Sequence, residues 1–288
     1  MPVTISISPS ELLKLRNHIL AGNIKTVRPR SEYELLRIED EDLSVVVYKS
    51  GKLVHNDTEA SRRLIDRILE RERDYDFLLG SDEVGKGEWY GPLVVVCAAL
   101  SADDIMRFRK IGVRDSKAIG KTDLDKLALL IIKSGITYHD VTLMPETYNR
   151  QYEQFSKERK TLNDLLAWCH AAAIRTTLAK VFPKRIKGSK IVIDKFDPKK
   201  MDLRLEAAGI KDEEVEIIQS SKGDEEVPVS VASIIAKYLF ELRVDELNRQ
   251  FNVDLRISKP TDLNPKILPQ VAKMHFKNVG SVGQNSCS

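Results

Sequence analysis

Two apolar runs around a short glycine-rich stretch constrain the fold of this chain most strongly. Residues 77–84, "FLLGSDEV", and residues 93–100, "LVVVCAAL", are rich in valine and leucine. Such runs are typical of strands that are buried on both faces and covered by helices on each side. Two shorter runs, "KIVID" at 190–194 and "VEIIQ" at 215–219, have the same character.

Long helical patterns alternate with these runs. The sequence predicts helices over residues 121–135, 161–182 and 227–251, and a further strand over "ITYHDVTLM" at 136–144. Strands that alternate with helices are typical of an α/β layered fold. We therefore expect a central mixed sheet flanked by helices.

The first seventy residues form a separate pattern. Ser8, Pro9 and Glu11 are suited to the N-cap and first turn of a helix. The pair Ser50-Gly51 predicts a hairpin turn between two strands. We expect a small α+β domain over 1–70, a linker over 71–77 and a larger domain over 78–288. The first helix is expected to carry four apolar residues near one face: Leu12, Leu13, Ile19 and Leu20.

Composition excludes several classes of protein. The three cysteines are far apart and form no CxxC pair, so neither a thiolate zinc site nor a disulfide framework is supported. No apolar run approaches the roughly 20 residues that span a bilayer, and the first residues do not resemble a secretory signal. We expect a cytoplasmic monomer. A net charge of +3 permits a nucleic-acid partner without requiring one.

Acidic residues stand where predicted strands end. Asp82 and Asp194 end their strands, and Asp224 lies in the turn after the strand at 215–219. Functional groups of an open α/β sheet gather at such ends. Glu83 directly follows Asp82, and the two can share one site only if the strand stops there, because neighbouring side chains of a strand point to opposite faces.

Clustered carboxylates repel one another unless cations neutralise them. Their oxygens suit hard divalent ions such as Mg²⁺ or Mn²⁺. Two such ions can activate water and stabilise a leaving oxygen during phosphodiester cleavage. Glu225 and Asp245 are alternatives to Asp224 as the fourth acid. His170 lies in an otherwise apolar predicted helix and is expected to be a core histidine.

Several motifs in order along the chain resemble type 2 ribonucleases H, and most closely the ribonuclease HIII branch. They are "GSDEVGKGEWYGPLVVV" at 80–96, "VRDSKAI" at 113–119, "PETYN" at 145–149, "LNDLLAWCH" at 162–170, "VIDKF" at 192–196 and "KGDEEVPVSVASIIAKY" at 222–238. The stretch "VVVYKSGKLVHN" at 45–56 resembles the TATA-binding-protein-like module that precedes the catalytic domain in ribonuclease HIII. In that family the module helps to hold the substrate.

This resemblance implies hydrolysis of RNA within an RNA–DNA hybrid, leaving 5′-phosphate and 3′-hydroxyl ends. It implies that two metal ions are held by Asp82, Glu83, Asp194 and Asp224. The backbone amides of Gly85, Lys86 and Gly87 are expected to contact the RNA strand. The 2′-hydroxyl is the group that distinguishes RNA from DNA.

Other residues are candidates for supporting roles. Asp115, Ser116 and Lys117 form a motif that can support the site or bind phosphate, although a turn with a helix cap explains it equally well. Ser233 and Lys237 are four residues apart, hence on one helical face that can meet the nucleic acid.

Two other functions compete with this interpretation. One is the ribonuclease HII type of cleavage, at a single ribonucleotide embedded in DNA. The other is a catalytically silent protein that only binds hybrids. A glycine-loop nucleotide binder is excluded, because "EVGKGEWYG" has neither the GxxxxGK[ST] order nor the G-x-G-x-x-G spacing.

Overall fold

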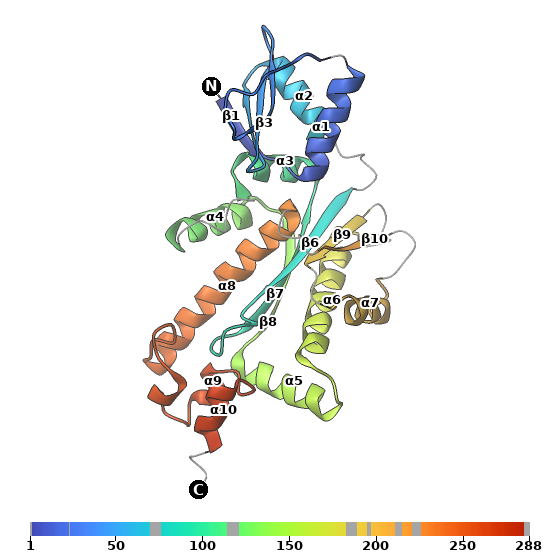
Figure 1. Cartoon of the computed structure of the whole chain (residues 1–288). Coiled ribbons are helices and arrows are strands. Elements are labelled where there is room, and N and C mark those ends of the chain that lie inside the picture. The colour runs from blue at the N-terminus through green and yellow to red at the C-terminus, as the bar shows by residue number, and fades with distance from the viewer. Residues whose placement is uncertain are drawn as a thin grey trace.

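The computed structural model describes residues 2–22, 24–69, 76–113, 121–182, 189–194, 197–210, 215–220 and 226–284. Two five-stranded sheets organise these residues, one in an N-terminal unit (residues 2–69) and one in a C-terminal unit (residues 76–284). The two units lie end to end, with the N-terminal sheet at one end of the molecule and α10, the last described helix, at the other (Figure 1).

The N-terminal sheet is antiparallel, with the strand order β1–β5–β4–β3–β2. Its strands are β1 (Pro2–Ser6), β2 (Thr26–Val27), β3 (Glu34–Glu39), β4 (Ser44–Tyr48) and β5 (Lys52–Asn56). Helices α1 (Pro9–Ala21) and α2 (Glu59–Leu69) pack on one face through a core of valine, isoleucine and leucine. The predicted hairpin is present between β4 and β5, with Gly51 in the left-handed region at φ +79°. Strands β1 and β2 were not predicted.

Helix α1 begins as its sequence predicts, but its buried face differs from the predicted apolar face. Ser8 and Glu11 form the predicted capping box, in which the Ser8 amide donates to the Glu11 carboxylate over 2.7 Å. Of the four apolar residues expected near one face, Leu13 and Leu20 are 59% and 77% exposed, so that face is only partly covered by the core. Glu11 is buried instead, together with Leu15 and Ile19 of the same helix.

The C-terminal sheet is mixed, as predicted, with the strand order β10–β9–β6–β7–β8. Its strands are β6 (Phe77–Val84), β7 (Leu93–Leu100), β8 (Thr137–Leu143), β9 (Ser189–Asp194) and β10 (Val215–Ser220). Strands β6, β9 and β10 run parallel, whereas β7 and β8 are antiparallel to their neighbours. The stretch between β6 and β7, residues 85–92, is called the glycine loop below.

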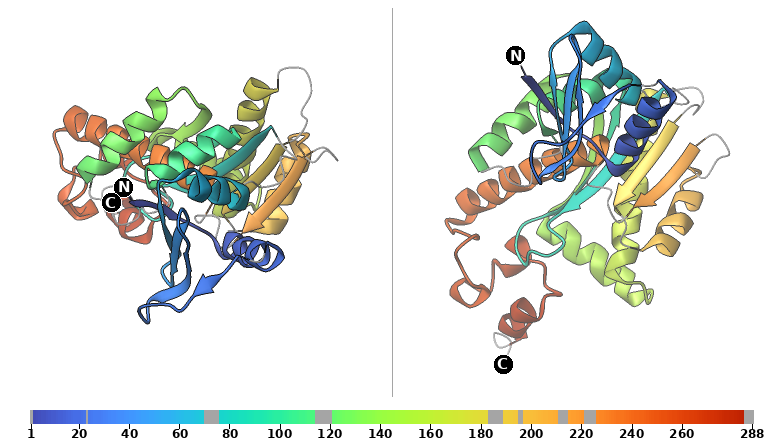
Figure 2. Two further views of the ribbon diagram at one scale, coloured as in Figure 1. Left: turned by 90° about the horizontal axis from the view of Figure 1, so that it is seen from above. Right: turned by 45° about the horizontal axis from the view of Figure 1, so that its top comes forward.

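Helices cover both faces of this sheet (Figure 2). On one face lie α3 (Ala102–Lys110), α4 (Lys121–Lys133) and α8 (Val227–Phe251), and on the other lie α5 (Pro145–Lys157), α6 (Leu162–Val181) and α7 (Pro198–Ala207). All eight residues of β7 are buried: Val94 and Val96 pack toward α8, and Val95 and Cys97 toward α6. The chain ends with η3 (Pro260–Asp262), α9 (Leu268–Val271) and α10 (Lys277–Gln284).

Gly80 allows α8 to approach β6 very closely. A Cβ atom at this position would lie 2.2 Å from the Val229 nitrogen and from the Pro228 carbonyl carbon. The first turn of α8 therefore rests directly on the backbone of β6, two residues before Asp82.

A buried ion pair joins the two units. The Arg109 guanidinium on α3 lies 2.6 Å from the Glu11 carboxylate on α1, and the two side chains are only 5% and 2% exposed. Glu11 thus caps its own helix and pairs with the C-terminal unit. Among the described residues, no helix is both long and apolar enough to cross a membrane. The cytoplasmic location and the monomeric state stay predictions.

Candidate functional site

The paired acids lie at the end of β6, where the sheet opens. The parallel ladder between β6 and β9 ends at Ser81 and Ile193, so Asp82 and Glu83 lie one and two residues beyond it. On the other side, Asp82 and Glu83 stay paired with Val96 and Val95 of β7. On the β9 side the pairing thus stops before the acids, as their sharing of one site requires, whereas on the β7 side the strand continues to Val84, one residue past the predicted end. Asp82 turns toward α8 and Glu83 toward α6, but both lie at the edge that β9 leaves open, close enough for the charge of Glu83 to raise the pKa of Asp82.

Asp82 is directed toward α8. Its carboxylate accepts a hydrogen bond from the Ser233 hydroxyl and another from the Glu83 amide, the latter at 2.9 Å. Burial raises the pKa of Asp82, and the negative charge of Glu83 adds to this effect, while the two hydrogen bonds oppose it. The carboxylate thus sits where a nearby cation would stabilise its charged form.

Glu83 is directed toward α6, where it meets a fully buried histidine. The Glu83 Oε2 atom lies 3.2 Å from His170 Nε2. The other ring nitrogen, Nδ1, lies 2.8 Å from the Ser81 hydroxyl, which donates to the Val96 carbonyl over 3.0 Å. Burial acts to raise the pKa of Glu83, but the His170 hydrogen bond and the Lys86 charge outweigh burial and lower it.

His170 is buried, as predicted for a core histidine, but its contacts are those of a site residue. Its ring joins Ser81 on one side to Glu83 on the other. Since the sequence places Ser81 and His170 far apart, no local spacing indicated this bridge. The only available signal was a histidine in an otherwise apolar helix.

The glycine loop begins directly after the acids. Gly85 has φ +94°, and a Cβ atom there would lie 2.2 Å from the Pro92 carbonyl oxygen. The fold of this chain therefore requires glycine at position 85 regardless of any ligand. Gly87 is exposed, and a Cβ atom there would have no neighbour within 4 Å. The Lys86 ammonium lies 3.6 Å from Glu83.

The remaining predicted residues divide into three groups. Ser233 reaches Asp82, whereas Lys237, one turn further along α8, is exposed. The backbone of Asp194 ends β9 in register with Ser220 of β10, at the same sheet edge as Asp82, and its side chain lies outside the described atoms. Outside the described residues lie the candidates Asp115, Ser116, Lys117, Asp224 and Glu225.

Asp245 does not belong to this cluster. It lies twelve residues beyond Ser233 on α8, about 18 Å along the helix axis. Its carboxylate is 2.6 Å from the Arg256 guanidinium. Among the residues that the structure describes, no three metal-binding side chains come together. The described part of the predicted metal site is thus the pair Asp82 and Glu83.

Comparisons with known proteins identify the family of this chain. The family model described as ribonuclease HII matches residues 79–279. Ribonuclease HIII of Chlamydia pneumoniae is 28% identical, with 98% of each chain covered. Ribonuclease HIII of Aquifex aeolicus is 25% identical over 94% of this chain and 95% of its own.

Solved structures show the same fold. The crystal structure of Bst-RNase HIII in complex with Mn²⁺ has a TM-score of 0.62 at 19% identity and covers 99% of this chain and 100% of its own. The Aquifex aeolicus RNase H3 structure has a TM-score of 0.54 at 24% identity and covers 95% of this chain and 100% of its own. Because the family model spans more than half of the sequence, the chain belongs to the ribonuclease HII family, and its full-length relatives are ribonucleases HIII.

Proposed function

We propose that this protein hydrolyses the RNA strand of RNA–DNA hybrids, leaving 5′-phosphate and 3′-hydroxyl ends. The observation that carries the proposal is the position of Asp82 and Glu83, which lie beyond the end of the β6–β9 ladder in a chain of this family. Asp194 ends the adjacent parallel strand at the same edge. Asp224 is proposed to complete the set from the segment before α8.

The residues present fit divalent metal ions. Burial and the neighbouring Glu83 carboxylate raise the pKa of Asp82, so a bound cation would favour the ionised form of this acid. Their oxygens are the ligands that Mg²⁺ and Mn²⁺ prefer. We propose that Asp82, Glu83, Asp194 and Asp224 hold two such ions. When bound, such ions lower the pKa of a water molecule and stabilise the leaving oxygen of the phosphodiester.

Neighbouring side chains hold the two proposed metal ligands, Asp82 and Glu83, in position. The Ser233 hydroxyl holds the Asp82 carboxylate from the α8 side, and His170 holds Glu83 from the α6 side. Each acid is thus fixed by a group on a different helix. Such outer contacts orient metal ligands and strengthen metal binding.

The glycine loop is proposed to recognise RNA. The amides of Gly85, Lys86 and Gly87 would contact phosphates and 2′-hydroxyls, and the open surface at Gly87 leaves room for close approach. Lys86 is proposed to pair with Glu83 in the free protein and to be available to phosphate in the complex. Lys237, and the segment containing Asp115, Ser116 and Lys117, are proposed as further backbone contacts.

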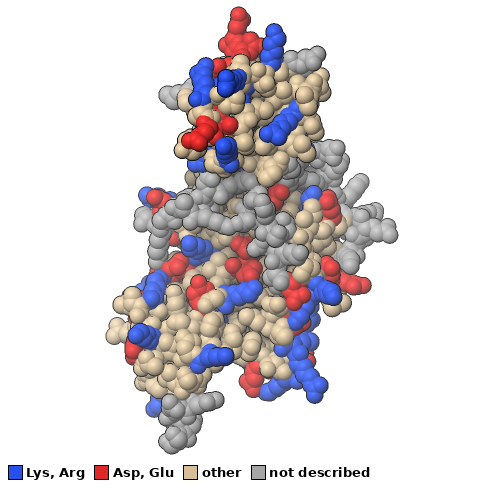
Figure 3. All heavy atoms as spheres, viewed as in Figure 1, with Lys and Arg blue, Asp and Glu red and all other residues tan. Residues whose placement is uncertain are grey.

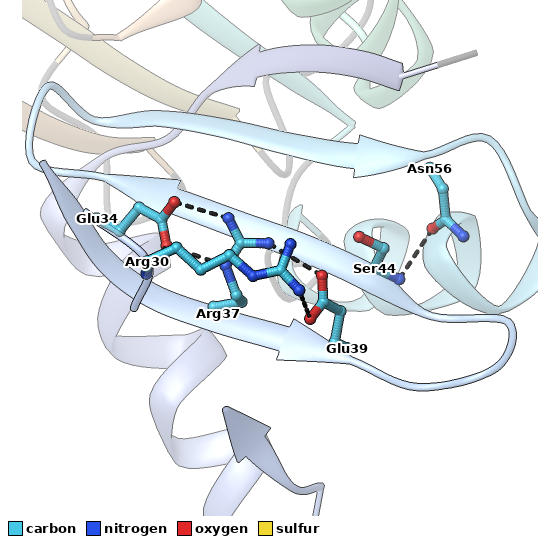
Figure 4. Close-up of polar contacts among 6 residues, drawn as sticks. All are labelled: Arg30, Glu34, Arg37, Glu39, Ser44 and Asn56. Atoms are coloured by element: carbon cyan, nitrogen blue, oxygen red, sulfur yellow. Dashed lines mark hydrogen bonds and ion pairs between the residues drawn. The ribbon is translucent and has the colours of Figure 1, made fainter. Parts of the chain in front are cut away.

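The N-terminal unit is proposed as a TATA-binding-protein-like domain that holds the substrate. Figure 4 shows an arginine–glutamate network on its sheet, made by Arg30, Glu34, Arg37 and Glu39. Arg37 donates to both carboxylate oxygens of Glu34, over 3.0 and 2.7 Å. The hydrogen bond from Arg37 is the main reason why the pKa of Glu34 falls to about 2.

These ion pairs limit how strongly this sheet can attract phosphate. Arg30 and Arg37 are already matched by Glu34 and Glu39, so a phosphate has to compete with carboxylates for them. Basic and acidic side chains are also interspersed over the face drawn in Figure 3. Recognition is therefore proposed to rest on the glycine loop and the acidic site more than on a basic surface.

Cleavage at a single ribonucleotide embedded in DNA is the nearest alternative. The full-length similarity to ribonucleases HIII, which includes the N-terminal unit, favours the hybrid substrate instead.

Two variants test the site. Asp82→Asn should abolish cleavage of a uniform hybrid while leaving hybrid binding largely intact, because a ligand is lost without a change of shape. Asp245→Asn is the matched control and should cut normally. Equal activity of both variants would refute the role of Asp82.

A third variant tests the loop. Gly87→Ala should fold normally, since its Cβ atom meets nothing in the free protein. We expect it to raise KM for the hybrid, because the added methyl group occupies the proposed substrate surface. An unchanged KM would contradict contact at this position.

A further inference from the structure

We propose that Lys273 is a positioning residue that fixes the glycine loop to the C-terminal segment of the chain. The functional half of this inference rests on the proposed function, since it takes the glycine loop to contact the substrate. The structural half stands on the hydrogen bonds of Lys273 alone.

Three consecutive carbonyl groups of the loop accept hydrogen bonds from this one lysine. The Lys273 ammonium donates to the carbonyl oxygens of Glu88 and Tyr90, over 3.0 and 2.8 Å. Its backbone amide donates to the carbonyl oxygen between them, that of Trp89, over 2.7 Å. Lys273 thereby supplies hydrogen-bond donors for carbonyl groups that lie outside the strands of the sheet.

The loop is also joined to this segment by backbone pairing. Tyr90 forms an antiparallel bridge with Ala272, and the Gly91 amide donates to the Val271 carbonyl over 2.9 Å. The segment is in turn held by Asn149 of α5. The Asn149 side chain donates to the Ala272 carbonyl over 2.9 Å and accepts from the Met274 amide over 2.9 Å.

The burial of Lys273 shows that these contacts are specific. The residue is fully buried, and its ammonium lies 5.7 Å from the centre of the Tyr148 ring. A lysine is rarely placed in such surroundings unless its polar atoms are hydrogen-bonded. Burial lowers the pKa of Lys273 to about 7, and even the neutral amine keeps two N–H donors for the two carbonyl groups. The hydrogen bonds from Lys273 to the glycine loop, called the clamp below, therefore form in both protonation states of the lysine.

The consequence for function follows from the position of the loop. It begins one residue after β6 ends, and Glu83 is the second residue from that end. A loop pinned at residues 88–91 presents the amides of residues 85–87 in one conformation. Order that is built in before binding reduces the entropy lost on association. Loss of the clamp should weaken binding of the hybrid more than turnover once the hybrid is bound.

A tryptophan of the loop provides a direct readout. The chain has two tryptophans, so Trp168→Phe leaves Trp89 as the only tryptophan whose fluorescence is followed. In that background, Lys273→Met should increase acrylamide quenching of Trp89 and raise KM for a uniform hybrid by about tenfold, with kcat changed little. Lys266→Met, an exposed lysine of the same segment, is the control and should change neither.

The outcomes separate the two halves of the inference. Unchanged quenching in Lys273→Met would overturn the clamp. Increased quenching with an unchanged KM would overturn the link to substrate and leave the clamp standing. If the parent protein cuts no hybrid, the proposed function fails, and quenching still decides the clamp.

Hydrogen exchange decides the structural half even if Lys273→Met does not fold. In the unmodified protein, the amides of Gly91 and Lys273 should exchange as slowly as those of the sheet, since both are hydrogen-bonded across the bridge. Exchange at the rate of an open loop would overturn the clamp.

Discussion

Gly80→Ala should disturb the proposed site, because it forces the first turn of α8 away from β6. The new methyl group would lie 2.2 Å from the Val229 nitrogen, whereas ordinary contact begins at 3.4 Å. The strand and the first turn of α8 therefore have to separate by about 1.2 Å. Both partners are backbone, so no side-chain rotation can relieve the contact.

The expected magnitudes follow from this displacement. Overpacking of a filled core costs typically about 1–3 kcal/mol, and rigid neighbours place Gly80→Ala at about 3 kcal/mol. A shift near 1 Å also lengthens the hydrogen bond from the Ser233 hydroxyl to Asp82 and so weakens it. Misplacement of this size in a catalytic site reduces kcat by about 100-fold.

Urea denaturation and single-turnover cleavage of a hybrid would measure these two effects. Gly280→Ala is the control: its Cβ atom has its nearest neighbour at 3.4 Å, and it lies in α10, so its stability and rate should not fall. If Gly80→Ala keeps both stability and rate, the account of how α8 positions Asp82 is refuted.

Three further predictions concern buried polar groups. His170→Ala should weaken Mn²⁺ binding by about 10–100-fold, because Glu83 loses its fixed partner; titration calorimetry that shows unchanged affinity would contradict this. Glu11→Gln should destabilise the protein by about 3–5 kcal/mol in urea, because the buried Arg109 loses its counter-charge; a change below about 0.5 kcal/mol would show that the pair is not buried. The pKa of Lys273 is lower in the folded protein, about 7, than its ordinary value of 10.5, so the unfolded state binds more protons between these values and rising pH favours folding. From pH 7 to pH 9 the stability of the unmodified protein should therefore rise by about 2 kcal/mol relative to Lys273→Met, and a constant difference would refute the shift.

Local patterns predicted much of the fold. The capping box at Ser8 and the hairpin at Gly51 depend only on neighbouring residues, and both are present. The apolar runs became β6, β7, β9 and β10, and the run that is apolar at every position became β7, the strand that helices cover completely on both faces. Strands β1 and β2 lack such runs, since one lies at each edge of an antiparallel sheet.

Contacts between distant segments were not predictable in the same way. The sequence indicated that Asp82 and Glu83 are close to the strand end, but not that α8 holds one and α6 the other. Asp245 was a candidate because it lies on the same predicted helix as Ser233. The length of α8 places it too far along the helix to reach Asp82. Lys273 gave no sequence signal, since its three partners lie in the loop and are backbone atoms.

Metal-dependent cleavage of two matched duplexes tests the central claim most directly. One duplex is a uniform RNA–DNA hybrid, and the other is DNA with a single ribonucleotide, each incubated with Mg²⁺, Mn²⁺ or a chelator. The account predicts cleavage of the uniform hybrid in the presence of metal, loss of cleavage with chelator, and loss in Asp82→Asn. Cleavage only beside the single ribonucleotide would transfer the protein to the alternative specificity. Binding without cleavage of either duplex would contradict the catalytic assignment.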